Sequence, residues 1–420
     1  MTALRLVGRD FDGFRAAVSA HAAGWPGTVE ARWHSLRDLQ DLTVGGAAMH
    51  DGSTDLVVVP ADWLPALAEA GAVRSLSPML DRAAPDGWPG CWCPSFHEGI
   101  GYAGQVWGLP FHDGPQLLFT RTDLYDDPRQ QARYEEEHGV PLAPARTWVE
   151  LLAQASWFTR GPDLHGTVLA GAPDGHNNVY DFAVQLWLRG GDLLRGGKVV
   201  LDSPAAAEAL VFLRDLATRL VTPHAHDLDS VQSGAEFAAG RVATMLNWAG
   251  FAAFGREPGS PVHGRVHCSP APSAEDGSPT TTVNAFWAAA VSTGSAQHET
   301  AWDYLLHATS ARMDRETSRA GASGARLSTW QDEGLLSACP ELSLFAGAHE
   351  HSRPLWRVPQ LPFVVDVLSS LVDDVVWAGA PVEPSLTVAA HDIAVLLRTP
   401  GPARAPSQRH LVDHDHQENQ

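Results

Sequence analysis

The sequence predicts an α/β fold of two lobes, and three observations support this prediction. First, 420 residues exceed what one ordinary hydrophobic core organises. Second, strand and helix patterns alternate through residues 4–70, which is typical of a doubly wound α/β lobe. Third, residues 102–125 combine a hairpin turn, a proline, a polar kink and an apolar run. We interpret that stretch as a crossing of the chain between two lobes.

The first part of the chain predicts three strands that alternate with three helices. The apolar run DLVVV, residues 55–59, is short and unbroken, the pattern of a parallel strand covered on both faces. In the helix expected next, at residues 62–70, Leu64 and Leu67 share one face and Gly71 ends the helix. The other expected elements are strands at residues 4–7 and 29–33 and helices at residues 11–23 and 36–44. Residues 78–100, with several Pro, Gly and Trp, predict a loop.

The predicted crossing places two polar side chains at the floor of a cleft. Gly104 supplies a hairpin turn, Pro110 ends the extended segment, and a strand resumes at residues 117–119. His112 and Asp113 lie between, where a charged pair is costly unless it is hydrogen-bonded or faces solvent. We interpret them either as ligand contacts or as a turn in which Asp113 caps nearby amides.

The rest of the chain predicts a helix-rich second lobe. Thr147 and Glu150 form a capping-box pattern, Ser203 and Pro204 form another helix start, and SGAE from Ser233 begins a third helix. Further strands are expected at residues 168–170, 199–201, 242–248 and 283–291, and further helices at 178–188, 297–308, 310–319, 360–377 and 386–397. Residues 126–145 are polar and interrupted by proline, residues 255–282 predict an irregular connection, and residues 399–420 predict a disordered polar tail.

Composition and charge exclude several classes of function. A formal net charge of −20 argues against a nucleic-acid partner, because such proteins use basic patches to release counterions. No apolar run is long enough to span a bilayer. No signal peptide opens the sequence, so the sequence as it stands predicts a cytoplasmic chain. A true start upstream, with a signal, would instead predict a place outside the cytoplasm.

Neither cysteine nor histidine spacing predicts a metal site. Cys91 and Cys93 form a C-x-C pair far from Cys268 and Cys339, and this matches no common zinc spacing. Histidine pairs occur as HAH, HEH and HDH, at residues 224–226, 349–351 and 414–416, without the i, i+4 spacing of a helical zinc site. We expect no metal and no cofactor.

Several segments, taken in order, resemble the landmarks of one family. They are DLVVVPADWLPALAEAG, GQVWGLPFHDGPQLLFTRTDLY, TWVELLAQASWFT, NNVYDFAVQLWLRGGDLL, LDSPAAAEALVFLRDL, EFAAGRVATMLNW, GASGARLST and RPLWRVPQLPFVVDVLSSLVDDVVWAG. Over residues 4–397 the chain resembles the sugar-type (family 1) extracellular solute-binding proteins of ABC importers. Two features depart from the family: no signal peptide is visible, and residues 285–287 read AFW where many relatives read GGW.

The resemblance implies a periplasmic-binding-protein-like fold of type II, with two α/β lobes joined by hinge crossings. It implies a first lobe at residues 1–111 and about 280–310, and a second at residues 112–279 and about 311–398. It also implies a monomer that holds a carbohydrate in the interlobe cleft without chemistry, with an ABC permease as a candidate partner. Hydrogen bonds in such a cleft must be well made, because an unpaired buried polar group costs about 1–3 kcal/mol.

The resemblance and the predicted strand ends together give the candidate ligand contacts. Trp287 matches the position at which relatives place a stacking tryptophan, although a tryptophan in the core would fit the same strand. Asn247 and Trp248 end a strand at the expected cleft edge, with packing as the alternative. Arg326 lies in a loop that borders the cleft in relatives, or is a surface arginine.

Three more candidates lie at helix starts. Relatives use a polar residue near Asn178 and Asp181, although Asn178 could simply cap the helix and Asp181 could face either way. Trp63 follows the strand at residues 55–59, at the carboxyl end where open α/β sheets bind ligands, or it packs its own helix.

Three functions remain open from the sequence. The first is a carbohydrate-binding protein that serves an importer. The second is a cytoplasmic enzyme of sugar lyase or hydrolase type on the same fold, with His112 and Asp113 as its acid/base pair. The third is a cytoplasmic sensor that reports its ligand through lobe closure.

Overall fold

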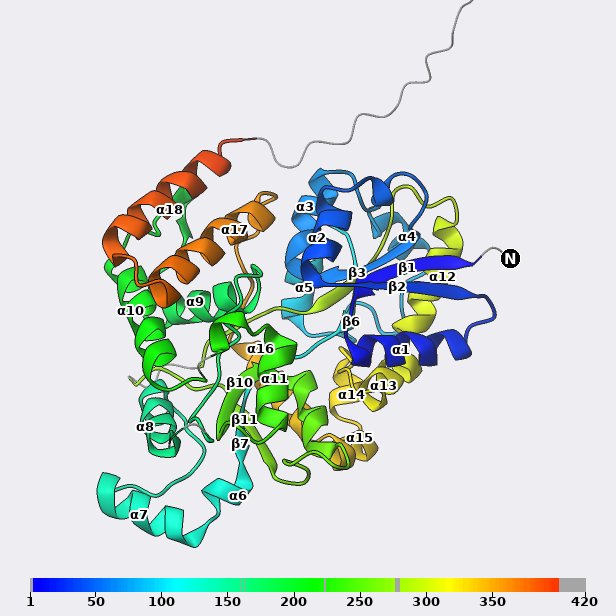
Figure 1. Ribbon diagram of the computed structural model, residues 1–420. Helices are drawn as coiled ribbons and strands as arrows, with labels where there is room; N and C mark the ends of the chain where they lie inside the picture. The colour runs from blue at the N-terminus through cyan, green and yellow to red at the C-terminus, as the bar shows by residue number, and fades with distance from the viewer. Residues whose placement is uncertain (1–2, 160, 162, 223, 276–279, 400–420) are drawn as a thin grey trace, which may run out of the picture.

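A computed structural model describes residues 3–159, 161, 163–222, 224–275 and 280–399. The chain forms two lobes that lie side by side, with helices around a sheet in each (Figure 1). Among the described residues, no helix has the length and apolar character needed to cross a membrane.

The first lobe is built on a five-stranded sheet in the order β2-β1-β3-β13-β6. Its strands are β1 (Leu4–Arg9), β2 (Val29–His34), β3 (Leu56–Pro60), β6 (Leu109–His112) and β13 (Trp287–Val291). The strands β1, β2 and β3 are parallel, and β13 runs antiparallel to β3 and to β6. The buried pattern of β3, apolar at every position, confirms the prediction of a strand covered on both faces.

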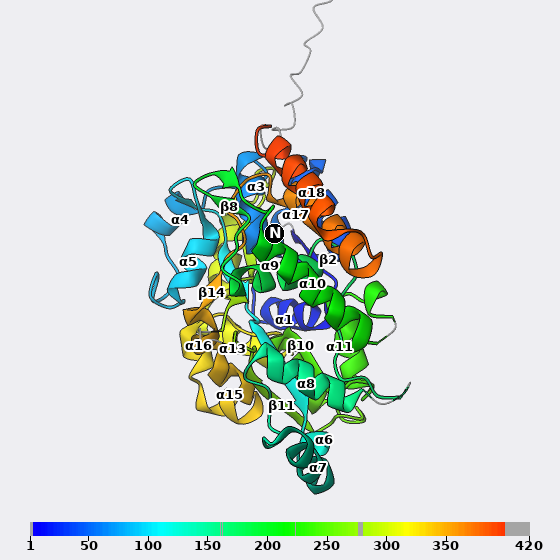
Figure 2. The same ribbon diagram turned by 90° about the vertical axis from the view of Figure 1, so that its left-hand side faces the viewer.

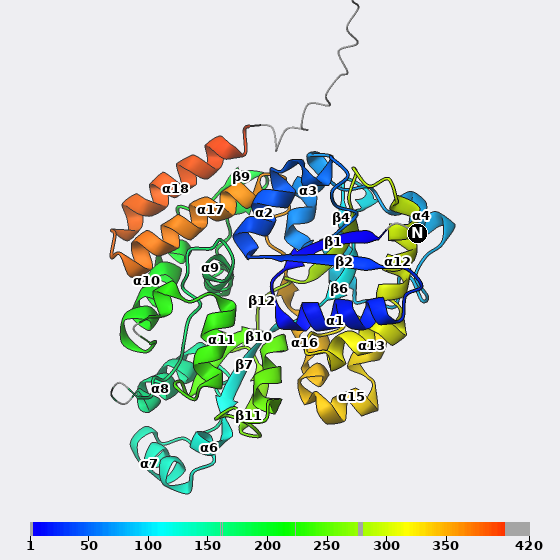
Figure 3. The same cartoon turned by 45° about the vertical axis from the view of Figure 1, so that its right-hand side comes forward.

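Helices cover both faces of this sheet. In Figure 3, α1 (Asp12–Ala23) lies below it, and α2 (Leu36–Val44) and α3 (Leu64–Glu69) lie above. The other helices named in this lobe are α4 (Ser77–Arg82), α5 (Pro94–Ile100) and α12 (His298–Ala308). Residues 78–100 are therefore not one loop as predicted, because α4 and α5 are short helices that begin with proline in their first turn.

The second lobe is built on a three-stranded antiparallel sheet in the order β10-β7-β11. Its strands are β7 (Gln116–Arg121), β10 (Thr244–Trp248) and β11 (Val266–Pro270). Its main helices are α8 (Trp148–Phe158), α9 (Asn177–Leu188), α10 (Pro204–Arg219), α11 (Ser230–Ala238), α17 (Leu361–Val372) and α18 (Val382–Leu396). The strand β11 falls in residues 255–282, so that segment is not irregular throughout.

The remaining elements are between 2 and 11 residues long. They are η1 (Ala47–Met49), η2 (Ala61–Trp63), β4 (Gly101–Tyr102), β5 (Gln105–Val106), α6 (Thr122–Tyr125), α7 (Pro128–His138), β8 (Leu194–Arg195), β9 (Lys198–Val199), η3 (Ala225–Asp227), η4 (Ala249–Arg256), β12 (Thr282–Val283), α13 (Ala311–Arg319), α14 (Leu327–Trp330), α15 (Glu333–Ala338), η5 (Pro340–Leu344), α16 (Phe345–Glu350), β14 (Ser352–Arg353) and the π-helical turn η6 (Asp373–Trp377). Figure 2 shows α7 at the far end of the second lobe, away from the five-stranded sheet.

The chain crosses between the sheets where the sequence predicted it. The strand β6 belongs to the five-stranded sheet and β7 to the three-stranded one, so residues 113–115 carry the chain across. Pro110 does not end the extended segment, however, because it lies inside β6. An edge strand tolerates proline, since one of its sides makes no ladder hydrogen bonds.

Three further expectations differ from the structure. The capping box of α11 is formed by Asp229 and Gln232, so the helix begins earlier than Ser233. No strand forms at residues 168–170, and the strand expected at residues 283–291 is divided into β12 and β13. The disordered tail predicted at residues 399–420 lies outside the described residues from 400 onward.

The apolar side chains form two main cores. One surrounds the five-stranded sheet and continues onto the three-stranded sheet through Phe119, Phe237 and Met245, and the other is formed by α9, α10, α17 and α18. Burial of each large apolar side chain stabilises the fold by about 1.5–3 kcal/mol. Helix α13 packs on α1, where His21 Nε2 lies 3.0 Å from Thr317 Oγ1. The predicted boundaries of the two lobes stay a prediction.

Candidate functional site

A cavity lies between the lobes and is the candidate ligand site. It encloses about 580 Å³ of empty space, a figure that includes space open to solvent. The residues that line it from the five-stranded sheet and its loops are Arg9, Phe11, Phe14, Pro60, His112, Phe286 and Trp287. Those that line it from the other side are His176, Tyr180, Ser230, Val231, Trp248, Gly250 and Phe251, with Gly114 and Ala285 in the connecting segments.

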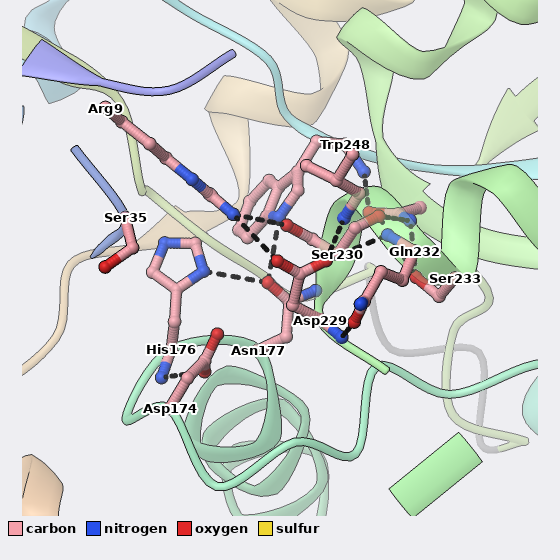
Figure 4. Close-up of polar contacts among 12 residues, drawn as sticks. Arg9, Ser35, Asp174, His176, Asn177, Asp229, Ser230, Gln232, Ser233 and Trp248 are labelled. Carbon is pink, nitrogen blue, oxygen red and sulfur yellow. Dashed lines mark hydrogen bonds and ion pairs between the residues drawn. The ribbon is translucent and has the colours of Figure 1, made fainter. Parts of the chain in front are cut away.

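Arg9 is the charged group of the cavity. It is the last residue of β1, so its side chain leaves the carboxyl end of a parallel strand. Arg9 NH2 donates to Ser230 Oγ at 3.3 Å and lies 3.8 Å from Asp229 Oδ2, at the N-terminus of α11 (Figure 4). Burial lowers the pKa of Arg9, although Asp229 and Asp174 partly offset this effect. The guanidinium thus keeps a long ion pair and can donate to a ligand.

Two indole rings form apolar walls. Trp287 begins β13, and its ring meets that of Phe14 edge to face at 5.0 Å. Trp248 ends β10, where its Nε1–H donates to Asn177 Oδ1 at 3.1 Å and its ring meets Tyr180 at 5.6 Å. Aromatic faces of this kind pack against the apolar C–H surface of a sugar ring.

Two histidines line the cavity and are neutral at pH 7. Ser323 N–H donates to Nδ1 of His112 at 2.9 Å, and burial lowers the pKa of His112 to about 4. The Nδ1 of His176 lies 2.8 Å from Asn177 Oδ1, and burial, with the charge of Arg9, lowers its pKa to about 3. The cavity therefore contains imidazoles as hydrogen-bonding groups rather than as cations.

Asp113 lies beside the cavity but does not line it. Its Oδ2 accepts from His349 Nε2 at 2.9 Å, and both side chains are buried. The His349 ring is stacked on Trp330 at 5.3 Å and meets Phe96 at 4.7 Å. The structure thus does not join His112 and Asp113 by a hydrogen bond, and each side chain makes separate contacts.

Three of the other predicted contacts do not line the cavity, and their side chains are hydrogen-bonded to protein groups. Asn178 Nδ2 donates to Ser369 Oγ at 2.8 Å. Asp181 accepts from Gln116 Nε2 at 3.4 Å, and burial raises the pKa of Asp181 to about 7. Asn247 Nδ2 donates to the Ser230 carbonyl at 3.0 Å, so Asn247 holds the helix end that Arg9 reaches.

The last two predicted contacts also lie away from the cavity. Arg326 Nε donates to the Thr309 carbonyl at 2.6 Å, and its NH1 donates to the Asp86 carbonyl at 2.9 Å. Trp63 is part of the core of the first lobe. Ligand contact by these five residues stays a prediction. Of the predicted set, the structure brings His112, Trp248 and Trp287 together around one cavity.

Sequence reasoning missed Arg9 and did not single out His176. For Arg9 a signal was present, because the residue follows the first strand just as Trp63 follows the third. For His176 no such signal existed, since one histidine in a loop is not distinguished by spacing. Among the described residues, no cluster of three His, Cys, Asp or Glu side chains could hold a metal.

Contacts across the cleft hold the lobes together. Tyr180 OH, on α9, donates to Asp62 Oδ2, beside β3, at 2.8 Å. Burial raises the pKa of Asp62 to about 6, although the Tyr180 hydrogen bond lowers it in part. At the exposed rim, Arg37 NH1 on α2 lies 3.0 Å from Asp366 Oδ1 on α17. These contacts join the two lobes across the cleft.

Comparisons with known proteins agree with this architecture. A family described as "Bacterial extracellular solute-binding protein" matches residues 27–330. A "Probable ABC transporter-binding protein" of Deinococcus radiodurans is 24% identical over 257 residues, 59% of this chain. The chain matches only 58% of the length of that curated relative.

Solved structures match nearly the whole chain. An ABC transporter solute-binding protein of Agrobacterium radiobacter, in complex with ribitol, has a TM-score of 0.83 and 24% identity, covering 94% of this chain and 98% of that one. A maltose-bound protein of T. maritima has a TM-score of 0.82 and 23% identity, covering 94% and 99%. A protein of Agrobacterium vitis with bound D-mannitol has a TM-score of 0.79 and 18% identity, covering 93% and 96%. These similarities show the two-lobe periplasmic-binding-protein-like fold.

Proposed function

The chain belongs to the bacterial extracellular solute-binding proteins, and from this premise we propose that it binds a small carbohydrate between its lobes for an ABC importer. The observation that carries the proposal is the cavity itself, in which two indole rings from different sheets face a buried arginine and two neutral histidines. Sugars need this combination, because a ring or alditol chain has an apolar face and many hydroxyls.

The ligands of similar proteins support this choice. The solved structures named above hold ribitol, maltose and D-mannitol, and another, from Thermotoga lettingae, holds α-D-tagatose. All are uncharged polyhydroxy compounds. The cavity of this chain offers no cation beyond Arg9 among the residues that line it, which fits an uncharged ligand better than a strongly anionic one.

Calorimetric titration tests the proposal. Ribitol, D-mannitol, D-tagatose and maltose are titrated into the protein, and we expect at least one to bind. Trp287→Ala should weaken binding about tenfold, because one aromatic contact is worth about 0.5–1.5 kcal/mol. Trp25→Ala, which removes a ring that packs on Tyr304 away from the cavity, is the matched control and should bind as the wild type does. If none of the carbohydrates binds, the proposal is excluded.

Recovery of the ligand distinguishes binding from chemistry. The carboxylate of Asp113 is occupied by His349, which argues against its use as an acid/base partner of His112. We therefore expect mass spectrometry to recover the bound sugar unchanged after prolonged incubation. Conversion that disappears in His112→Ala would instead establish the enzyme.

We further propose that the chain acts as a monomer, outside the cytoplasm, with an ABC permease as its partner. Support comes from the family, which is extracellular. Cell fractionation and copurification with a permease test this assignment, and recovery of the chain only from cytosol would contradict it.

A further inference from the structure

The two cavity histidines differ in which ring nitrogen is held by the protein's hydrogen bonds. In His112, Nδ1 accepts from the Ser323 amide at 2.9 Å. The Ser323 carbonyl lies 3.1 Å from the same nitrogen and accepts from the Asp113 amide at 3.0 Å. A backbone amide can only donate, so the nitrogen that faces it at 2.9 Å presents its lone pair and not a proton. A neutral ring whose Nδ1 accepts must carry its proton on Nε2. His112 is therefore a donor through Nε2–H.

His176 has the opposite arrangement. Its Nδ1 lies 2.8 Å from Asn177 Oδ1, and the same oxygen accepts from Trp248 Nε1–H at 3.1 Å. The indole N–H can only donate, so it fixes the carbonyl end of the Asn177 amide at this position. His176 Nδ1 must then donate to that oxygen, and Nε2 carries the lone pair. His176 is an acceptor through Nε2.

Both Nε2 atoms are free for a ligand. Neither has a hydrogen-bond partner in the described part of the chain, and neither is sealed from solvent. The two rings line one cavity, His112 from the end of β6 and His176 from the residue before α9, and keep 7% and 6% exposure. A glycine, Gly114, faces His112 Nε2, and a Cβ there would stand 3.5 Å from that atom.

We propose that His112 and His176 are a specificity pair of opposite tautomers. In this pair, His112 Nε2–H donates to a hydroxyl group of the ligand. His176 Nε2 accepts from the same hydroxyl group or from another one. This inference rests on the proposed function, because it concerns the carbohydrate of the same cavity. A hydroxyl both donates and accepts, so it satisfies both rings. A carboxylate cannot donate to His176, and an ammonium group cannot accept from His112. The pair thus selects uncharged sugars and alditols over sugar acids and amino sugars whose charged group occupies this position.

The low pKa values of both rings agree with this assignment. Burial lowers the pKa of His112 to about 4 and that of His176 to about 3, so both stay neutral through the pH range in which a sugar would bind. Arg9, whose charge disfavours protonation of His176, lines the same cavity and is a third polar group available to a ligand.

Nuclear magnetic resonance of the ligand-free protein tests the tautomers directly. Long-range ¹H–¹⁵N spectra are recorded on ¹⁵N-histidine-labelled protein at neutral pH. We expect the His112 ring to be protonated only on Nε2 and the His176 ring only on Nδ1. His112→Gln should remove the first signal and His176→Gln the second. An imidazolium at either position, or the same tautomer at both, would overturn the proposal. This readout does not require a ligand, so it stands even if the proposed function fails.

Titration with a carbohydrate that binds in the first screen tests the role in specificity. His112→Phe and His176→Phe should each weaken binding about tenfold or more, the effect of one unmade buried hydrogen bond. His112→Gln and His176→Gln should recover part of the affinity, because an amide offers both a donor and an acceptor. His267→Phe changes an exposed histidine on β11 and should leave the affinity unchanged. Phe variants that fold, by their unfolding temperature, and bind as the wild type does would also overturn the proposal.

Discussion

At the scale of single residues, a buried pair of opposite charges, Asp113 and His349, lies beside the cleft. Burial alone would lower the pKa of His349, but the charge and hydrogen bond of Asp113 raise it to about 10. The ring is therefore an imidazolium at neutral pH, held between Phe96 and Trp330. The pair fixes the start of the crossing segment, residues 113–115, to α16.

Removal of this imidazolium should destabilise the fold in a pH-dependent way. His349→Gln leaves the Asp113 carboxylate buried without a counter-charge, at a cost of about 3 kcal/mol in the free energy of unfolding at neutral pH. The His349 pKa is higher in the folded state than its usual value of about 6.5, so its contribution is complete below about pH 6.5 and is lost as pH rises through about 10.

Urea unfolding of both proteins between about pH 6 and pH 10 measures this difference. The gap between wild type and His349→Gln should shrink as pH rises. His351→Gln, two residues away and exposed, is the control and should show no such gap. A gap that stays constant with pH would contradict the charged assignment of His349.

The sequence identified part of the cavity and not the rest. His112, Trp248 and Trp287 line it, because each follows or begins a strand at the edge where the sheets meet. Asn247 and Asp113 have the same sequence context but turn their side chains to Ser230 and His349. A sequence pattern gives the position of a residue along a strand, whereas the direction of its side chain depends on contacts with distant segments.

At the scale of elements, the short helix α5 determines the shape of one cavity wall. Its Gly99 allows the Phe286 ring to lie against the helix, and a Cβ at Gly99 would stand 2.4 Å from that ring. The same ring packs on Phe96, also on α5, at 4.4 Å, and Phe286 lines the cavity. The sequence did not predict α5, because its seven residues carry too little periodicity to distinguish a helix from a loop.

Gly99→Ala should therefore reduce both stability and binding. The added methyl group displaces the Phe286 ring toward the cavity, which should destabilise the fold by about 1–3 kcal/mol and weaken carbohydrate binding. Thermal unfolding and calorimetric titration measure the two effects. Gly347→Ala, also in a short helix but with open space around it, is the matched control and should stabilise the fold by about 0.5–1 kcal/mol. Equal behaviour of the two variants would contradict this role of Gly99.

At the scale of the whole molecule, the two lobes and their first crossing were predictable because strand and helix periodicity is local. The antiparallel insertion of β13 between β3 and β6 was not predictable from the sequence, because it joins segments more than 170 residues apart. Several direct contacts join the lobes, among them those of Arg9 with Ser230, Tyr180 with Asp62 and Arg37 with Asp366. Of these, the Tyr180–Asp62 hydrogen bond is buried, whereas the Arg37–Asp366 pair is exposed and contributes about 0–1 kcal/mol.

Tyr180→Phe should shift the ligand-free protein toward the open form. The variant keeps the ring but loses the hydroxyl that binds Asp62, so affinity should fall between a few-fold and about tenfold. Small-angle X-ray scattering should show a larger radius of gyration without ligand. Tyr304→Phe is the control, because the buried hydroxyl of Tyr304 has no partner within the described residues. An unchanged radius together with unchanged affinity would show that this hydrogen bond does not hold the lobes closed.

The Asp62 carboxyl connects this closure with acidity. Its Oδ1 is buried without a hydrogen-bond partner among the described residues, and burial raises its pKa to about 6, above the usual value near 3.9. Opening of the lobes far enough to expose the carboxyl to water would restore that usual value. Between these two pH values, closing takes up a proton and opening releases it. Acid below about pH 6 therefore favours the closed form, and alkali favours the open one. In a mildly acidic medium, each cycle of capture and release would exchange protons with the surroundings as well as a sugar.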